Sequence, residues 1–402
     1  MKRVVITGQG TINSLGLNVS DTNLALKSGN TGIKKLDLKN CELLRVNIGA
    51  QIQNYDPHGF FKKNEISILD HFSQYALISA SEAIKSSGIV ISDELSEETG
   101  VIIGSAGGGL STQEENYRIV FESKKNRVHP FVVPKMMHNA AASNIAKRYS
   151  LRGVTYSVSS ACASSNHAIA NAFNLIKFGE ARVMIAGGSD AMLTFGGMKA
   201  WEGLRVLSKT GCRPFCLSRD GLVQGEGAAV FVLEEYTHAC KRGANILAEI
   251  KSCSMTSDGY DLVAPSAAGV KKSILKSLCD SEISVDDIDY INAHGTGTKL
   301  NDQIESDVIN LIFSNNRISP KVSSTKSAHG HVMGATGAIE LLSCILALRE
   351  HVIVPTLGLI KKDPKIKLDL VCGETQEKRV ETVISNSFAF GGLNSTIVLK
   401  AV

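Results

Sequence analysis

The segment Ser159-Ser160-Ala161-Cys162-Ala163-Ser164-Ser165 decides the fold, because a strand is expected to turn there directly into a helix. Residues 154–159 predict the strand, and residues 162–178 predict a helix that ends at Gly179, since glycine is common just beyond helix C-termini. A second apolar run over 183–186 predicts another buried strand. Strand, helix and strand in close succession are typical of an α/β fold.

The same order of strand, glycine turn and helix runs through the rest of the chain in two rounds. The first round predicts strands over 4–7, 101–103, 154–159 and 183–186, with helices over 67–87, 139–149 and 162–178. The second predicts strands over 246–255, 289–293, 383–387 and 396–399, with helices over 268–279, 302–313 and 330–348. Two such rounds predict two similar halves, residues 1–250 and 251–402, that pack as one body.

Composition excludes several classes of protein. The 402 residues include 43 basic and 39 acidic side chains, so the net charge of 43 − 39 = +4 is too small to indicate nucleic acid as the main partner. A hydrophobic content of 43% with 20% charged residues is ordinary for a globular protein. We expect no membrane span, because no run of about 18 uninterrupted apolar residues occurs, and no signal peptide, because the first apolar stretch is too short.

The nine cysteines have no regular spacing, and we expect them to be reduced thiols in a cytoplasmic protein. Cys212 and Cys216 are the closest pair, but no second Cys or His pair follows at zinc-finger spacing, so we expect no metal site. Cys162 differs from the others because it is expected at the first helical position, where the helix dipole and unpaired N–H groups favour a thiolate. Cys162 is therefore the candidate nucleophile, and the other eight are interpreted as small buried apolar residues.

Three further segments carry candidate chemistry. His294 follows a predicted strand and precedes a glycine turn, at the position where α/β proteins bind ligands. Residues 324–331, which contain Lys326, His329 and His331, again pass from strand to helix. Residues 385–392 end a strand in a flexible turn, whose backbone N–H groups can face an oxyanion. Each segment alone is a weak signal, since a lone histidine is more often structural.

Taken together, these segments resemble the elongating β-ketoacyl-acyl-carrier-protein synthases, members of the thiolase-like superfamily. The resemblance covers essentially the whole chain, and its most specific part is the ordered set Cys162, His294, Lys326 and His331. Residues 160–167 and 299–303 also resemble the nodulation-type branch of that family. Further matching motifs are Val4-Val5-Ile6-Thr7-Gly8, Gly187-Gly188-Ser189, Arg213-Pro214-Phe215, Arg219-Asp220-Gly221, Gly225-Glu226-Gly227 and Asn386-Ser387-Phe388.

The resemblance implies a five-layered αβαβα fold, a homodimer and a defined set of roles. Cys162 would take an acyl chain from the phosphopantetheine thioester of an acyl carrier protein. His294 and His331 would hydrogen-bond the malonyl thioester oxygen while carbon dioxide leaves. Lys326 would support the two histidines electrostatically, with Glu305 as its ion partner. Besides the carrier's phosphopantetheine, no cofactor is implied.

The resemblance also implies an oxyanion hole and an acyl pocket. The backbone N–H groups of Cys162 and Phe390 would form the oxyanion hole, and Phe390 would gate entry. The acyl pocket would include Gly107, Trp201 and Val132 of the partner subunit. Some relatives have larger residues where this chain has Gly107 and Val132, so the pocket is expected to be wide enough for a long, branched or unsaturated chain. The alternative is that neighbouring side chains refill the space.

Two other functions stay open on the sequence. A catalytically silent subunit resembling a chain-length factor would lack the nucleophilic cysteine. A thiolase-type enzyme that uses coenzyme A would have a second catalytic cysteine late in the chain. The sequence does not fix the acyl chain length, nor does it decide between fatty acid elongation and a specialised acyl pathway.

Overall fold

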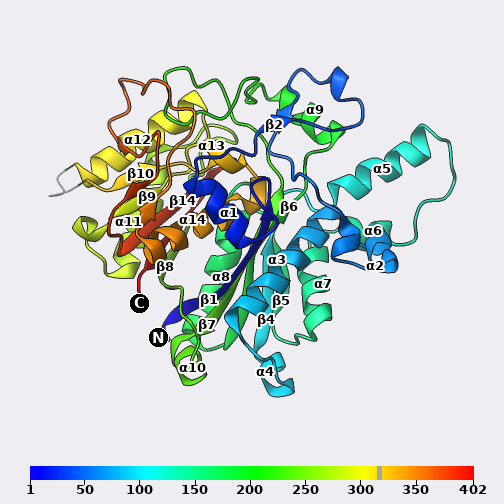
Figure 1. Ribbon diagram of the computed structural model, residues 1–402, viewed down its shortest axis with the longest axis horizontal. Coiled ribbons are helices and arrows are strands. Elements are labelled where there is room, and N and C mark those ends of the chain that lie inside the picture. Colours follow the sequence, from blue (N-terminus) through cyan, green and yellow to red (C-terminus); the bar gives the residue numbers. More distant parts are fainter. Residues whose placement is uncertain (315–318) are drawn as a thin grey trace.

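The computed structural model describes residues 1–314 and 319–402. Its large sheet has the strand order β12-β10-β9-β14-β15-β8-β1-β7-β6-β4-β5 (Figure 1). The strands of this sheet are β1 (Val4–Asn13), β4 (Thr99–Gly104), β5 (Thr155–Val158), β6 (Val183–Asp190), β7 (Gly227–Glu235), β8 (Ala248–Ser257), β9 (Tyr290–Asn292), β10 (Lys321–Ser323), β12 (Asp369–Leu370), β14 (Thr382–Ala389) and β15 (Leu393–Lys400). Two small sheets pair β2 (Lys34–Lys35) with β3 (Ile48–Gly49), and β11 (Val352–Ile353) with β13 (Gln376–Glu377).

The strand order repeats, which confirms the prediction of two similar halves. In the order β1-β7-β6-β4-β5, the first two pairs are antiparallel and the last two are parallel. The order β8-β15-β14-β9-β10 has the same sequence of pair types. Antiparallel pairing of β1 with β8 joins the two sets. The division at residue 250 falls within β8 and stays a prediction.

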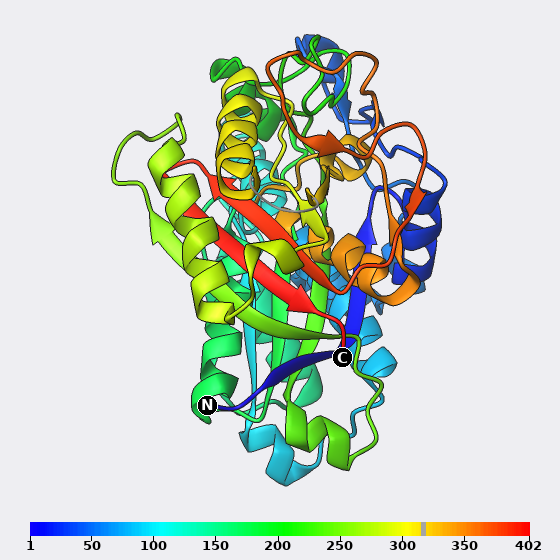
Figure 2. The ribbon, with the colours of Figure 1, turned by 90° about the vertical axis from the view of Figure 1, so that its left-hand side faces the viewer.

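The helices complete five layers, so the predicted αβαβα fold is confirmed. Helices α8 (Ser164–Phe178) and α14 (Thr336–Glu350) form the middle layer, because each contacts strands of both halves. Helices α3 (His71–Ser87) and α7 (Ala140–Tyr149) cover the outer face of the first half (Figure 1), whereas α11 (Ala267–Ser281) and α12 (Lys299–Phe313) cover that of the second (Figure 2). One continuous apolar core runs through the middle layer and both sets of strands.

Shorter helices lie around this framework, and α5 stands out from the body of the protein (Figure 1). They are α1 (Val19–Lys27), α2 (Lys63–Ile68), α4 (Asp93–Glu97), α5 (Leu110–Phe121), α6 (Val132–Met136), α9 (Phe195–Gly203), α10 (Tyr236–Lys241), α13 (Lys326–His329) and the 3₁₀ turns η1 (Cys41–Leu43), η2 (Pro57–Gly59), η3 (Val285–Asp287) and η4 (Met333–Ala335). Within residues 1–314 and 319–402, none of the helices is long and apolar enough to cross a membrane.

Three predicted helices differ from the observed ones. The helix expected over 67–87 is divided into α2 and α3, because the carboxylate of Asp70 caps α3 by accepting the N–H of Phe72 at 3.1 Å. The helix expected from residue 330 begins only at Thr336, since Gly330 has a φ of +70° and the 3₁₀ turn η4 comes first. The helix expected from Cys162 begins at Ser164.

Candidate functional site

The turn that carries Cys162 is tightly fixed between β5 and α8. Ala161 has a φ of +50°, a left-handed conformation that is uncommon for a residue with a Cβ. The hydroxyl of Ser164 accepts the N–H of Ser160 at 2.9 Å and donates to the carbonyl of Ala161 at 2.7 Å. A Cβ on Gly104 would lie 2.3 Å from the Ser164 carbonyl carbon, so only glycine lets α8 start against the end of β4. The backbone therefore holds the Cys162 side chain in one place.

The electrostatic surroundings of Cys162 differ from the prediction. The residue is 6% exposed, and this burial raises the pKa of its thiol to about 11, although Lys326 and the backbone N–H of Phe390 favour the thiolate. The predicted lowering of the pKa is wrong because Cys162 precedes the first helical residue and desolvation outweighs the favourable donors. The thiol is therefore protonated near neutral pH.

His294 and His331 lie together, as the sequence predicted. Their ring centroids are 5.6 Å apart and the rings are nearly perpendicular. Burial, followed by the charge of Lys326, lowers the pKa of both imidazoles well below the usual value, so both are neutral. Nδ1 of His331 accepts the N–H of Met333 at 3.0 Å, which places the ring hydrogen on Nε2. His331 is thus a neutral Nε2–H donor.

The ring of His294 is held less tightly by the protein. Its Nδ1 is buried and has no hydrogen-bond partner among residues 1–314 and 319–402. An unpaired buried polar atom is costly, and it is commonly explained by a group that is absent from the structure. The protein's own hydrogen bonds therefore do not fix which ring nitrogen of His294 carries the hydrogen.

His329 has a structural role, which supports the choice of His331 made from the sequence. Nδ1 of His329 donates to the carbonyl of Gly330 at 2.7 Å, and Nε2 lies 3.0 Å from the hydroxyl of Thr325. Burial lowers the pKa of this imidazole to about 3, so it stays neutral. Both ring nitrogens are occupied, and neither is free for a substrate.

Lys326 is fully buried, and its ion partner is not the predicted one. Its Nζ lies 2.5 Å from Oε1 of Glu340, a residue of α14 that is also fully buried. Glu305 instead accepts the backbone N–H groups of His294 and Gly295, each at 2.8 Å. The prediction of a Lys326–Glu305 pair is therefore wrong, and Glu305 is a positioning residue that fixes the backbone of His294.

Phe390, the residue predicted to gate entry, lies against another aromatic residue. Phe390 follows β14, and its ring stacks on that of Trp201 with centroids 5.8 Å apart and an interplanar angle of 24°. The backbone N–H of Phe390 also lies close enough to Cys162 to favour the thiolate. Val132 is the first residue of α6, the helix that follows α5 in the chain, and its side chain is half-buried.

Gly107 comes three residues after the end of β4, and the space next to it is filled. Its N–H donates to the carboxylate of Asp190 at 3.0 Å, and this buried carboxylate also accepts the N–H of Gly334 at 2.6 Å. A Cβ on Gly107 would lie 2.7 Å from Cγ of Met192. The side chain of Met192 therefore occupies the room that a larger residue would take.

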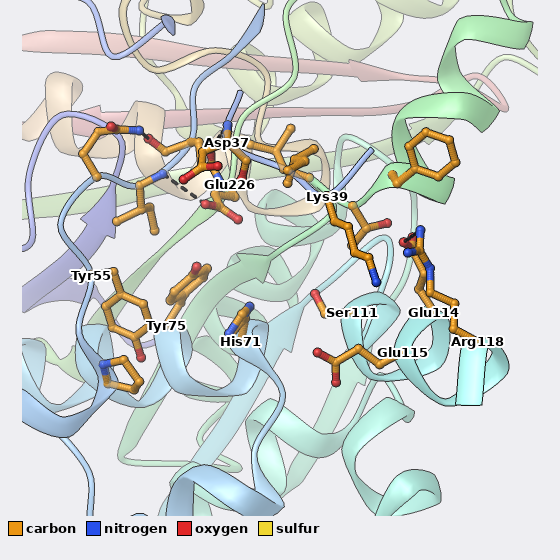
Figure 3. Close-up of a pocket in the computed structure, with 18 of the residues that line it drawn as sticks. Asp37, Lys39, Tyr55, His71, Tyr75, Ser111, Glu114, Glu115, Arg118 and Glu226 are labelled. Carbon is orange, nitrogen blue, oxygen red and sulfur yellow. Dashed lines mark hydrogen bonds and ion pairs between the residues drawn. The ribbon is translucent and has the colours of Figure 1, made fainter. Parts of the chain in front are cut away.

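A separate cavity of about 950 Å³ lies between α3, α5 and the loop around Tyr55 (Figure 3). The rings of Tyr55, Tyr75 and His71 form one side, and Glu114 and Arg118 of α5 lie on the other. None of the candidate catalytic side chains lines it. In the part of the chain that the structure describes, no group of three or more His, Cys, Asp or Glu residues is arranged to hold a metal ion.

Comparisons with known proteins agree with this geometry. Residues 1–239 match the family described as "Beta-ketoacyl synthase, N-terminal domain", and residues 247–359 match "Beta-ketoacyl synthase, C-terminal domain". The chain is 40% identical over 401 residues to Nodulation protein E of Rhizobium leguminosarum bv. trifolii, with 100% of both proteins covered. It is 38% identical over 409 residues to 3-oxoacyl-[acyl-carrier-protein] synthase 2 of Coxiella burnetii, with 100% of this chain and 99% of that protein covered.

Two solved structures are similar along the whole chain. The ishigamide ketosynthase/chain length factor matches with a TM-score of 0.95 at 28% identity, covering 100% of this chain and 99% of that one. A type II polyketide ketosynthase, solved in complex with its acyl-carrier protein, matches with a TM-score of 0.90 at 28% identity and the same coverage.

Proposed function

Because the chain belongs to the β-ketoacyl synthase family, we propose that it is a 3-oxoacyl-acyl-carrier-protein synthase that condenses malonyl-carrier protein with an acyl chain held on Cys162. The observation that carries the proposal is the convergence of a buried cysteine, two neutral imidazoles and a buried lysine on one site. Acyl carrier protein is the expected donor, and a similar ketosynthase solved with its carrier protein supports this partner.

In the first half-reaction, the acyl chain moves from the carrier to the enzyme. The sulfur of Cys162 attacks the thioester carbonyl, the bond to the carrier's phosphopantetheine sulfur breaks, and the proton of Cys162 passes to that leaving thiol. The backbone N–H groups of Cys162 and Phe390 stabilise the negative oxygen of the intermediate.

In the second half-reaction, the malonyl thioester loses carbon dioxide. The electron pair of the broken C–C bond enters the thioester and forms an enolate, whose oxygen accepts the Nε2–H of His331 and a hydrogen bond from His294. Neutral donors suit this role, because the hydrogen bonds strengthen as charge develops on the oxygen. The enolate carbon then attacks the acyl carbonyl on Cys162, the bond from that carbonyl to the Cys162 sulfur breaks, and the released thiolate takes a proton from water to restore the thiol.

The histidines are expected to serve decarboxylation more than acyl transfer. His294→Ala and His331→Ala should each slow malonyl decarboxylation by about 10²–10³-fold, the usual loss for one oxyanion donor, while Cys162 is still acylated. The two steps are measured separately, by carbon dioxide release and by intact mass of the acylated protein. His329→Ala is the matched neighbour and should leave decarboxylation nearly unchanged. If it is as damaging as His331→Ala, the choice between these two histidines is wrong.

The proposed function is tested by comparing acyl donors. Radiolabelled acyl-carrier protein should acylate Cys162 and yield a 3-oxoacyl product with malonyl-carrier protein, whereas the same acyl group on coenzyme A should transfer much more slowly. If acetyl-coenzyme A served efficiently as both acyl donor and acyl acceptor, without malonyl decarboxylation, the protein would instead be a thiolase-type enzyme. Binding without any acylation would identify a chain-length-factor-like subunit, a reading that the presence of Cys162 disfavours.

We also propose that two copies form a homodimer. Strand β5 is at the edge of the sheet, and its Tyr156 and the preceding Val154 are exposed. Exposed apolar edges commonly pair with another chain. Phe131 and Val133 expose further apolar surface around α6. In such a dimer, α6 of one copy would face the other copy. Val132 of one subunit could then border the acyl pocket of its partner. The nine free cysteines support the expected cytoplasmic location.

A further inference from the structure

Gln224 lies opposite His331 in a short stretch of parallel pairing. The carbonyl of Val223 accepts the N–H of His331 at 2.7 Å, and the N–H of Gly225 donates to the carbonyl of His331 at 2.9 Å. Two residues paired in this way project their side chains to the same side of the ladder. The side chain of Gln224 therefore leaves the backbone on the side of the His331 imidazole.

The residues next to this pair face the other side of the ladder. A Cβ on Gly225 would lie 3.3 Å from the Cβ of Ala50, and a Cβ on Gly330 would lie 2.7 Å from the same atom. Gly225 and Gly330 therefore face one side together. Since successive side chains alternate between the two sides, the residues beside them in the chain, Gln224 and His331, share the opposite side.

The amide of Gln224 is buried and unpaired. The residue is 1% exposed, and neither Oε1 nor Nε2 has a hydrogen-bond partner among residues 1–314 and 319–402. Within these ranges, Asn166 is the only other amide side chain with both polar atoms buried and unpaired, and it lies against Gly337 of α14. Burying an amide without partners is unfavourable, so an additional binding partner for Gln224 is the natural explanation.

Gln74 shows how this protein satisfies a buried amide elsewhere. It is 2% exposed, its Oε1 accepts the hydroxyl of Tyr55 at 2.5 Å, and its Nε2 donates to the carbonyl of Leu69 at 3.2 Å. Gln74 and Gln224 have the same side chain and nearly the same burial. Only the amide of Gln224, which shares a side with a candidate catalytic histidine, is left for another molecule.

The chemistry around Gln224 favours a neutral partner. A side-chain amide offers two N–H donors and a carbonyl acceptor, and a hydroxyl group can pair with both. A carboxylate would pair with the donors only and leave Oε1 without a partner. Glu226 comes two residues later on the same side, and its buried carboxyl lines the cavity of Figure 3. A second carboxylate near it is unfavourable, which argues against the carboxylate of the malonyl group.

We infer that Gln224 is a specificity-determining residue that hydrogen-bonds a hydroxyl group on the acyl chain attached to Cys162. The inference rests on the proposed function and adds a substrate class, a hydroxylated acyl chain. Condensation requires the acyl carbonyl to lie next to the enolate held by His331, which brings the first part of the chain toward Gln224. A saturated chain leaves both atoms of the amide unpaired and is therefore transferred less well.

The test compares acyl-carrier proteins whose chains have one length and differ only in a hydroxyl group. One chain is saturated, and the others carry a single hydroxyl at successive carbons. Acylation of Cys162 is followed by intact mass. The wild-type protein should favour one hydroxylated isomer over the saturated chain by about tenfold or more. Gln224→Leu should remove this preference, because leucine fills a similar volume without polar atoms.

Gln74→Leu is the matched control. It should keep the preference for the hydroxylated chain but lower the midpoint of thermal unfolding, because Tyr55 and Leu69 lose their hydrogen-bond partner. Gln224→Leu should not lower that midpoint, since it removes a buried amide that is unpaired. A loss of stability equal to that of Gln74→Leu would overturn the inference, because the amide of Gln224 would then be paired within the resting protein.

The remaining outcomes distinguish this inference from the proposed function. If no carrier-bound chain acylates the wild-type protein, the proposed function itself is wrong. If saturated and hydroxylated chains are transferred equally well, or the preference persists in Gln224→Leu, Gln224 does not recognise a hydroxyl and the inference fails. It also fails if Gln224→Leu slows every chain by the same factor, because the amide then contacts the carrier's arm or only supports the site.

Discussion

Replacing Cys162 by serine is expected to reduce acyl transfer and condensation on the order of 10³-fold or more, while the protein keeps its fold. The hydroxyl has nearly the same volume as the thiol, so the tight turn around Ala161 and Ser164 is preserved. The hydroxyl is nevertheless a much weaker nucleophile than the thiol. Among the described residues, no side chain that could act as a general base is hydrogen-bonded to this position, so the serine would not be activated. Intact mass after incubation with acyl-carrier protein, together with circular dichroism, measures both effects.

The other cysteines provide the controls for this prediction. Cys216 and Cys344 are also buried, and Cys216→Ser should leave acylation unchanged. Since burial raises the pKa of Cys162 to about 11, its alkylation by a small reagent should accelerate steadily from pH 7 to 10. A plateau below pH 8 would mean that the thiolate is already formed in the resting enzyme. An acyl group found on Cys216 would show that Cys162 is not the nucleophile.

Local patterns predicted most of the strands and helices, because each of these elements follows from its own residues, but they missed β7, a buried strand that pairs with β1 and β6. Strands 101–103 and 383–387 lie within β4 and β14, and helix 268–279 lies within α11. Boundaries were less predictable, because they depend on caps and turns made by distant residues. Asp70, for example, divides the predicted 67–87 helix while its carboxylate also accepts the N–H of Thr112 on α5.

The candidate site was predictable in its residue types but less so in its pairings. Strand ends and glycine turns pointed to Cys162, His294 and His331, since parallel strands bring their carboxyl ends together. Their spacing along the sequence does not show which of Glu305 and Glu340 pairs with Lys326. The available signal was that Glu340 is the single acid in the mostly apolar stretch 337–348 of α14, which indicates a buried carboxylate that needs a cation. Desolvation of Cys162, which reverses the predicted pKa shift, depends on the packed structure alone.

Removing one member of the Lys326–Glu340 pair is expected to destabilise the protein strongly. Both side chains are fully buried and their charged atoms are 2.5 Å apart, so Glu340→Leu leaves a buried ammonium without its partner. Such a change costs about 3–5 kcal/mol of the free energy of unfolding. Urea unfolding at pH 8, above the pKa of about 7 to which burial raises the Glu340 carboxyl, measures the pair in its charged form.

The double variant Lys326→Met/Glu340→Leu separates the structural role of the pair from its catalytic one. Removing both charges should recover most of the stability, because replacing a buried ion pair by apolar side chains is often neutral or favourable. Lys326→Met/Glu305→Leu should not recover it, since the N–H groups of His294 and Gly295 would lose their acceptor. Equal recovery in both double variants would mean that Lys326 is shared between the two acids. Loss of decarboxylation in the stable Lys326→Met/Glu340→Leu protein would identify Lys326 as a residue that acts on the reaction through the two histidines, beyond holding α14 in place.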